Sequence, residues 1–167
     1  FKDQHVFVVG GGDTAMEEAN YLTRFCSKVT ILHRRDALRA SKIMQERAIA
    51  NEKIEFRWNT VVTELLGEPM GSGLRSVRLQ NTQTGDSWEE EIDGVFLGIG
   101  HKPNTDLFDG VLAMNDAGYL ITLPDRTATE IAGVFACGDV QDDYYRQAVT
   151  AAGSGCAAAI EAERWLE

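Results

Sequence analysis

The first apolar and polar positions of the chain predict a strand, a tight turn and a helix. The apolar run at residues 6–9 breaks off into the glycines at residues 10–12. Apolar or small residues then recur at helical spacing: Ala15, Ala19, Leu22 and Cys26. A second apolar run at residues 29–32 follows about twenty residues after the first, where a βαβ unit places its next parallel strand. The pattern therefore predicts a parallel βαβ unit.

The next elements extend this α/β pattern. Residues 41–50 are predicted to form a second helix with Ile43, Ala48 and Ile49 facing inward, and residues 54–58 a third strand. The periodicity then changes, which indicates that a different kind of sheet follows.

Three short runs separated by turn sequences are typical of an antiparallel β-meander. They lie at residues 61–66, 74–79 and 87–92. Residues 95–100 are predicted to close the unit as a last buried strand.

A domain boundary is expected at residues 100–104, where glycine and proline interrupt the chain and the pattern starts again. The first domain is thus placed at 1–100 and the second at 101–167. The second contains one predicted strand at 134–137 and a helix rich in Ala and Gly running from Arg146 to Trp165. Because these elements are too few to bury their own apolar faces, the second domain is expected to be incomplete.

The glycine turn fits the G-x-G-x-x-A pattern of a dinucleotide-binding turn. Gly10 allows the sharp turn out of the strand, Gly12 lets backbone approach a pyrophosphate, and Ala15 lets the helix lie close to the sheet. The phosphates would meet the positive end of the helix. Asp13 would repel phosphate, so an N-cap role is predicted for it. The bare pattern also fits an ordinary glycine-rich turn.

The end of the second predicted strand carries a basic cluster instead of an acid. An NAD-binding fold usually has an acidic residue there for the ribose 2′-hydroxyl. Here the sequence is HRRDALR, which supplies Arg34, Arg35 and Arg39. Guanidinium groups match a phosphate in charge and geometry. A basic cluster alone is often only a solvated surface, but at this position it favours the 2′-phosphate of NADP.

Composition limits the functional classes. The 167 residues include 16 Lys plus Arg and 26 Asp plus Glu, and the net charge of −10 argues against general binding to nucleic acid or to an anionic membrane. No apolar run approaches the roughly 18 to 20 residues of a membrane span, and no signal-peptide pattern opens the chain. A cytoplasmic protein is therefore expected. Cys26, Cys137 and Cys156 have no metal-ligand spacing and are interpreted as reduced, small buried residues.

The motifs GGGDTA, HRRDALR, GIGHKPNT and FACGDVQDDYYRQAV occur in this order across the chain. Together they resemble the low-molecular-weight thioredoxin reductases, and the YRQA segment is the most specific part of the likeness. The resemblance implies an α/β fold: a Rossmann-like three-layer NADPH-binding domain with a β-meander, followed by the C-terminal segment of a split FAD-binding domain.

The resemblance also implies cofactor roles for individual residues. Asp139 matches the residue that binds the flavin ribityl chain, and residues 146–148 match the segment at the pyrimidine edge of the flavin ring. The residues expected at NADPH are Gly10, Gly11, Gly12, Asp13, Thr14, Ala15, His33, Arg34, Arg35, Arg39 and Gly100. Those expected at FAD are Gly138, Asp139, Arg146, Gln147 and Ala148. No catalytic role is assigned to His33, His101 or Asp36.

In the family, a hydride passes from NADPH to FAD, and electrons continue through a Cys-x-x-Cys pair to the disulfide of thioredoxin. This sequence contains no Cys-x-x-Cys pair, so no catalytic residue is assigned within it. The chain is interpreted as the C-terminal part of a reductase that is a homodimer when complete, with the N-terminal half as its missing partner. Alone, it is expected to hold FAD weakly and to be inactive.

Other interpretations remain open from the sequence alone. A disulfide reductase of a peroxidase system and an NADPH-dependent ferredoxin reductase are related flavoproteins, although neither matches both HRR and YRQA. A non-catalytic NADPH-binding module made of this chain alone is a different class of protein.

Overall fold

The computed structural model describes residues 1–71 and 73–167, which form two compact units, Phe1–Gly100 and His101–Glu167.

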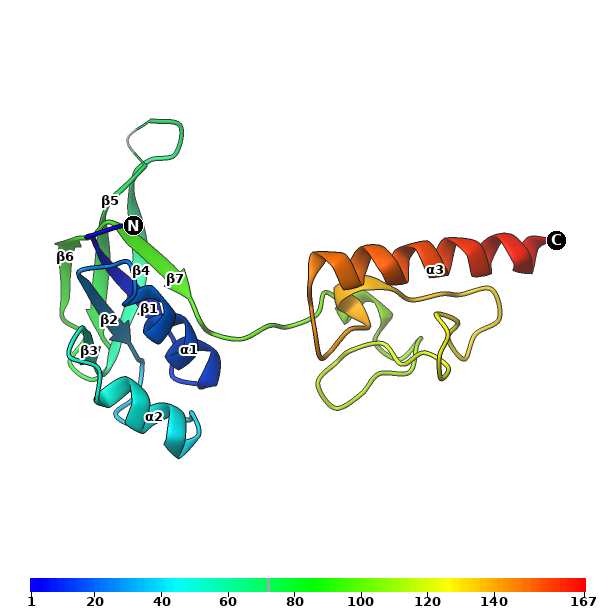
Figure 1. Ribbon diagram of the computed structural model, residues 1–167, viewed down its shortest axis with the longest axis horizontal. Coiled ribbons are helices and arrows are strands. Elements are labelled where there is room, and N and C mark those ends of the chain that lie inside the picture. Colours follow the sequence, from blue (N-terminus) through cyan, green and yellow to red (C-terminus); the bar gives the residue numbers. More distant parts are fainter. Residues whose placement is uncertain (72) are drawn as a thin grey trace. The chain divides into compact units, whose positions relative to one another are not determined.

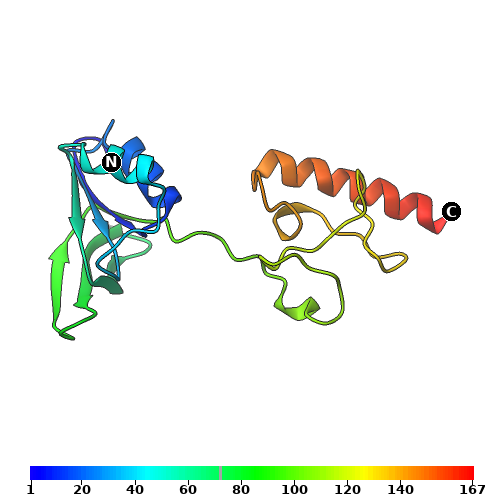
Figure 2. The ribbon, with the colours of Figure 1, turned by 90° about the horizontal axis from the view of Figure 1, so that it is seen from below.

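The first unit is built on a four-stranded parallel sheet. Its strands are β1 (His5–Val9), β2 (Lys28–Leu32), β3 (Ile54–Arg57) and β7 (Gly94–Leu97), in the spatial order β3-β2-β1-β7. Helix α1 (Asp13–Leu22) connects β1 to β2, and α2 (Lys42–Ile49) connects β2 to β3. Figure 1 shows these elements, and Figure 2 shows both helices gathered on one side of the strands. The predicted parallel βαβ unit is confirmed.

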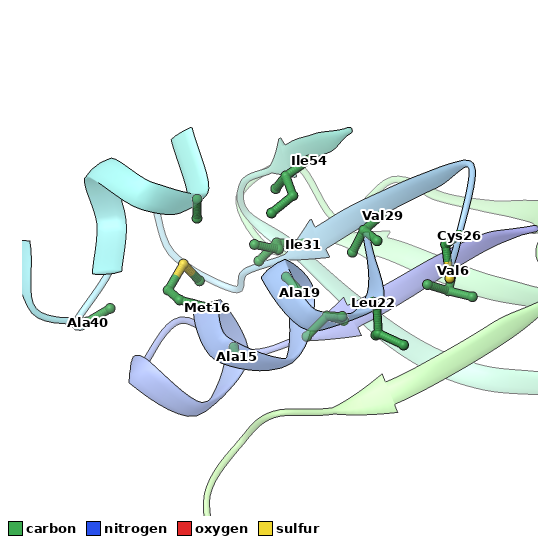
Figure 3. Packing of buried hydrophobic residues seen from close by; sticks show 12 residues of the cluster. Val6, Ala15, Met16, Ala19, Leu22, Cys26, Val29, Ile31, Ala40 and Ile54 are labelled. Atoms are coloured by element: carbon green, nitrogen blue, oxygen red, sulfur yellow. The ribbon is translucent and has the colours of Figure 1, made fainter. Parts of the chain in front are cut away.

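One face of the parallel sheet packs against the two helices. Val6 and Val8 of β1 and Val29 and Ile31 of β2 are fully buried there against Met16 of α1. Figure 3 shows Val6, Val29 and Ile31 of the sheet packed with Ala15, Met16 and Ala19 of α1. Residues at alternate positions of a strand point to opposite faces, so the neighbouring residues of β1 and β2 face the other side.

The opposite face is covered by an antiparallel meander of β4 (Thr60–Glu68), β5 (Gly73–Asn81) and β6 (Ser87–Glu91), in the order β4-β5-β6. Phe7 and Leu32 from the parallel sheet are buried there with Val77 and Leu79 of β5. Helices, parallel sheet and meander therefore form three layers. The predicted meander is confirmed.

Two details of the predicted first unit are wrong. Ile43 and Ile49 of α2 are 76% and 65% exposed, and Ala48 is the buried residue of that helix. The last strand ends at Leu97, and both Leu97 and Ile99 are exposed. The segment after β7 therefore leaves the sheet earlier than its apolar composition suggests.

The second unit contains the short helices η1 (Asp106–Phe108) and η2 (Gly138–Val140) and the long helix α3 (Ala148–Leu166). Leu112, Leu120 and Ala136 form its small core. The prediction of a strand at 134–137 is wrong, because Phe135 pairs with Ala128 only in an isolated bridge.

Two further expectations for the second unit are corrected. Helix α3 begins at Ala148 rather than at Arg146, whose φ of 52° is not helical. Of the three cysteines, Cys26 in the first unit is buried, whereas Cys137 is partly buried and Cys156 is exposed on α3. In the part of the chain that the structure describes, no helix is long and apolar enough to cross a membrane.

Candidate functional site

A cleft of about 410 Å³ opens at the carboxyl ends of β1 and β2. Parallel strands of an α/β sheet end at the same edge, and ligands of such folds bind there. The cleft contains eight of the residues predicted from the sequence: Gly10, Gly11, Gly12, Thr14, His33, Arg34, Arg39 and Gly100. Its volume lies within the range of small-molecule and cofactor sites.

Six residues of the cleft were not predicted: Val9, Leu32, Thr60, Val61, Gly98 and Ile99. Thr60 and Val61 come from the start of β4, and Gly98 and Ile99 follow β7. The Gly98-Ile99-Gly100 run was the only sequence signal for this part of the wall. Conversely, Asp13, Ala15 and Arg35 are not among the residues that line the cleft.

Gly10, Ala15 and Gly98 meet where α1 crosses the ends of β1 and β7. A β-carbon on Gly10 would collide with the Gly98 carbonyl oxygen and would lie 2.8 Å from the Ala15 β-carbon. A β-carbon on Gly98 would lie 2.7 Å from the Ala15 α-carbon. Only small residues allow this approach, so Ala15 supports the cleft by close packing rather than by lining it.

The start of α1 faces the cleft through its glycines. Gly12 is the N-cap residue, and its carbonyl accepts the first helical hydrogen bond from the N–H of Met16, at 3.3 Å. A β-carbon on Gly12 would have no atom within 4 Å, which leaves room for a ligand. The first N–H groups of a helix have no intrahelical partner and form a positive end that attracts phosphate.

The prediction that Asp13 caps α1 is wrong. Gly12 occupies the cap position, and α1 has no side-chain capping bond. Instead, Oδ1 of Asp13 accepts hydrogen bonds from the backbone N–H of Ser41, at 2.8 Å, and from its hydroxyl, at 3.0 Å. Ser41 lies 28 residues further along the chain and immediately precedes α2.

The arginine-bearing loop after β2 is attached to the glycine turn. The Gly11 carbonyl accepts the N–H groups of Arg39, at 2.7 Å, and Ala40, at 3.0 Å. Arg34 and Arg39 line the cleft, whereas Arg35 accepts the N–H of Asn59 through its carbonyl. Among the described residues, none of the three guanidinium groups forms an ion pair. Two arginines of the loop are therefore available to an anion in the cleft.

His33 lies buried beneath the turn. Its Nε2 is 3.0 Å from the Ala37 carbonyl, and because a carbonyl only accepts, Nε2 carries the hydrogen. The ring meets Trp58 edge-on at 6.3 Å. Burial lowers the pKa of His33, and the charges of the neighbouring arginines lower it further, against the opposing effect of the Ala37 hydrogen bond. The neutral His33 ring thus supports the loop through its hydrogen bond to Ala37 and does not itself attract an anion by charge.

In the second unit, Asp142 shapes the loop before α3. Its carboxylate accepts the N–H groups of Tyr144, Tyr145 and Arg146 at 2.8–3.1 Å and the Thr150 hydroxyl at 2.9 Å. Desolvation raises the pKa of Asp142, but these hydrogen bonds outweigh it and the pKa is lowered. The side chain thereby holds Arg146 in its left-handed backbone conformation.

The residues predicted at FAD lie around this loop. Gln147 is the N-cap of α3, and its side chain and Thr150 form a capping box. Gly138, with a φ of +74°, donates its N–H to the Ser154 hydroxyl at 3.0 Å, and Asp139 is exposed in η2. Ala148 begins α3 and is also exposed. The structure thus brings the glycine before Asp139 against α3 and leaves Asp139, Gln147 and Ala148 accessible to solvent within this unit.

Comparison with known proteins identifies the family of this chain. Residues 1–155 match the model of the pyridine nucleotide-disulphide oxidoreductase family. The chain therefore belongs to that family, and the α/β fold inferred from its motifs is confirmed.

Its relatives are more specific. The chain is 55% identical over 166 residues to thioredoxin reductase of Streptomyces clavuligerus, covering 99% of this chain and 51% of the relative. It is 52% identical to thioredoxin reductase 2 of Arabidopsis thaliana, covering all of this chain and 44% of the relative. The crystal structure of thioredoxin reductase from Streptococcus pyogenes MGAS5005 matches with a TM-score of 0.82 and 43% identity, covering 99% of this chain and 53% of that chain.

These similarities confirm the resemblance to thioredoxin reductases and favour it over the ferredoxin and peroxidase-system alternatives. The chain spans about half the length of the curated relatives it matches.

Proposed function

We propose that this chain is part of an NADPH-dependent flavoprotein disulfide reductase that acts on thioredoxin. Residues 1–100 bind NADPH, and residues 101–167 contribute the C-terminal part of an FAD-binding domain. The observation that carries the first assignment is that Arg34 and Arg39 line the same cleft as the glycine turn at the start of α1. The pyrophosphate and the 2′-phosphate of one ligand would thus each meet a separate, complementary group of the protein.

The residues fit the nucleotide part by part. Gly10–Gly12 and the N-terminus of α1 receive the pyrophosphate, with open space above Gly12. Arg34 and Arg39 bind the 2′-phosphate, and Gly100 and its neighbours form the wall beyond the turn. Arg35, although predicted as a ligand from the motif, contributes mainly through its positive charge near the loop. When bound, NADPH supplies a hydride for the flavin.

In the second unit, Asp139 and residues 146–148 are assigned to FAD. The Asp142 hydrogen bonds fix the backbone leading into α3, so the N–H groups at the start of α3 keep a defined direction. Such N–H groups stabilise negative charge on a reduced flavin ring. Bound FAD supplies the electron transfer between the nicotinamide and a disulfide.

The substrate assignment is supported by the relatives, which are named thioredoxin reductases. Cys26, Cys137 and Cys156 have no neighbour at Cys-x-x-Cys spacing, and all three are free. This spacing supports our proposal that the redox pair lies outside this sequence. In a flavin-loaded reductase containing this chain, replacing all three by Ser should leave most thioredoxin reduction intact. Loss of activity with flavin retained would contradict this proposal.

We further propose that the whole reductase is a homodimer located in the cytoplasm.

Calorimetric titration with NADP⁺ and NAD⁺ tests the nucleotide assignment. The unmodified chain should prefer NADP⁺. Each charge-assisted contact is worth roughly 1.5–3 kcal/mol before screening by solvent, so replacing Arg34 and Arg39 together by Ala should weaken NADP⁺ binding by about tenfold to several hundredfold. Arg35→Ala is the matched control for the single variant Arg34→Ala, because each removes one charge from the same loop and only Arg34 lines the cleft. Its effect should be much smaller.

Equal affinity of the unmodified chain for NAD⁺ and NADP⁺ would overturn the NADPH assignment. If Arg35→Ala cost as much NADP⁺ affinity as Arg34→Ala, general attraction rather than direct contact would explain the preference.

A further inference from the structure

Asp13 connects the beginnings of two helices. It is the first residue of α1, and its Oδ1 holds both the N–H and the hydroxyl of Ser41, the residue immediately before α2. The Ser41 hydroxyl makes no capping bond to α2. Its hydrogen bond to Asp13 therefore connects the two helices and does not cap α2.

The neighbouring hydrogen bonds extend this connection into a clamp. The Gly11 carbonyl holds the N–H groups of Arg39 and Ala40, and Asp13 holds that of Ser41. Three consecutive backbone N–H groups, at residues 39–41, thus point to the turn that begins α1. We call these bonds the 39–41 clamp.

The clamp fixes the backbone of an arginine that lines the cleft. Arg39 carries a long side chain with several rotatable bonds, and ordering such a chain on a ligand costs conformational entropy. A backbone held at the cleft wall restricts where the guanidinium group lies before the ligand arrives. Preorganised contacts of this kind add more to affinity than contacts made by a mobile loop.

The carboxylate of Asp13 does not itself bind a phosphate. Its negative charge near the helix start opposes an anion in the cleft, and Asp13 itself does not line the cleft. That unfavourable charge acts on the pyrophosphate, which NADP⁺ and NAD⁺ share. The clamp, in contrast, acts on Arg39, whose proposed partner is present only in NADP⁺.

We propose that Asp13 is a positioning residue for cofactor choice: through Ser41 it holds the Arg39 loop so that the cleft prefers a 2′-phosphorylated dinucleotide. This inference rests on the proposed NADPH site and adds a residue that acts without touching the cofactor.

The test is the ratio of NADP⁺ to NAD⁺ affinity, measured by calorimetry on the whole chain. Asp13→Ala should reduce this ratio by about five- to tenfold, the equivalent of one or two lost hydrogen bonds. Asp13→Asn keeps an oxygen that accepts from Ser41, so it should retain the ratio within about twofold, although its lost charge strengthens binding of both cofactors. Glu17→Ala, which removes a charge from an exposed position of the same helix, is the matched control and should leave the ratio unchanged.

Amide hydrogen exchange without cofactor gives an independent readout. Asp13→Ala should speed exchange at the N–H groups of residues 39–41 and leave exchange in β1 and β2 unchanged. Ser41→Ala removes only the hydroxyl contact and should speed exchange at the same groups to a smaller degree. This second variant retains the backbone bond, so it remains informative if Asp13→Ala folds poorly.

The outcomes separate the two proposals. If the unmodified chain prefers NADP⁺ and Asp13→Ala keeps that ratio, the positioning role of Asp13 is overturned while the NADPH site stands. A uniform loss of affinity for both cofactors would likewise show a structural role only. If the unmodified chain shows no preference, the NADPH assignment fails. Unchanged hydrogen exchange at residues 39–41 in Asp13→Ala would independently disprove the 39–41 clamp.

Discussion

The ring of His33 lies directly against the α-carbon of Gly11. A β-carbon at Gly11 would be 2.8 Å from Nε2 and even closer to two other ring atoms. The G-x-G-x-x-A pattern leaves this middle position free, so here it is the neighbouring histidine that requires a glycine. The contact joins the turn after β1 to the residue that follows β2.

Gly11→Ala should therefore destabilise the first unit by about 1–3 kcal/mol, the usual cost of forcing extra volume into a packed site. The displaced ring would lose its bond to the Ala37 carbonyl, and the Gly11 carbonyl would shift away from Arg39 and Ala40. Urea unfolding measures the stability, and calorimetry should show weaker NADP⁺ binding.

Gly12→Ala is the contrasting variant. Its new β-carbon meets no atom within 4 Å, and its φ of −99° suits alanine. Stability should change by less than about 1 kcal/mol, while NADP⁺ and NAD⁺ should both bind more weakly because the methyl group occupies the approach to the pyrophosphate. Equal stability losses in the two variants would contradict the packing of His33 against Gly11.

Stability should fall as the pH drops below about 6.5, because two histidines are held neutral in the folded chain. Burial lowers the pKa of His33 and of His5, whose ordinary value is 6.5, and nearby positive charges add to both effects. Below pH 6.5 the unfolded chain therefore takes up protons that the folded chain does not, and unfolding is favoured. The loss ends once the pH lies below the folded pKa values, where both states are protonated.

Urea unfolding from about pH 8 to about pH 5 measures this dependence. Replacing both histidines by Asn should flatten the curve in that range. Glu90 and Asp142 have lowered pKa values and ordinary values of 4.5 and 3.8, so their contributions are lost only at lower pH. A slope between pH 6.5 and 5 that survives in the double variant would have another origin.

The sequence predicted the parallel sheet because β1 and β2 are buried on both faces, so residues 6–9 and 29–32 form two mostly apolar runs about twenty residues apart. It did not predict which side of α2 is buried. At about 100° per residue, Ile43, Ala48 and Ile49 lie about 100–140° from one another around a helix, so the three cannot share one face. Eight residues gave too short a pattern for the apolar positions to identify the buried side.

Long-range contacts explain the other features that the sequence did not predict. An N-cap role is predicted for Asp13 because its carboxylate would repel phosphate, but the sequence does not show that its hydrogen-bond partner is Ser41, 28 residues away. The apolar run at 134–137 formed no strand, since a strand requires a neighbouring ladder and Phe135 meets only Ala128. Gly98 was overlooked as part of the cleft because its approach to Ala15 is visible only in three dimensions.

Gly98→Ala should move the start of α1. The new β-carbon would lie 2.7 Å from the α-carbon of Ala15, and backbone rather than a flexible side chain must give way. A loss of about 1–3 kcal/mol in unfolding free energy is expected. Because the shift reaches the turn that both cofactors share, NADP⁺ and NAD⁺ affinity should fall together, without a change in their ratio. A selective loss of NADP⁺ binding would contradict this account.

Arg57 of β3 and Glu90 of β6 form a two-pronged ion pair that joins the parallel sheet to the meander. The guanidinium carbon lies 5.5 Å from the ring centre of Phe7, and the two side chains are only 29% and 27% exposed. Burial raises the pKa of Glu90, but the hydrogen bond and charge of Arg57 outweigh it, and the pKa is lowered. Removing the carboxylate would leave Arg57 half-buried without its partner.

Glu90→Ala should therefore lower the unfolding free energy at neutral pH by about 1–2 kcal/mol. The control is Glu64→Ala, which removes the carboxylate paired with Arg78 between β4 and β5, where both side chains are 48% exposed. Solvent screens such a pair, and the loss there should not exceed about 0.5 kcal/mol. Because the folded pKa of Glu90 is lowered, its contribution is present above pH 4.5 and disappears as the pH falls through the folded value. The difference between Glu90→Ala and the unmodified chain should accordingly shrink in acid, and a difference that persists undiminished there would show that packing, not the ion pair, connects the two sheets at this point.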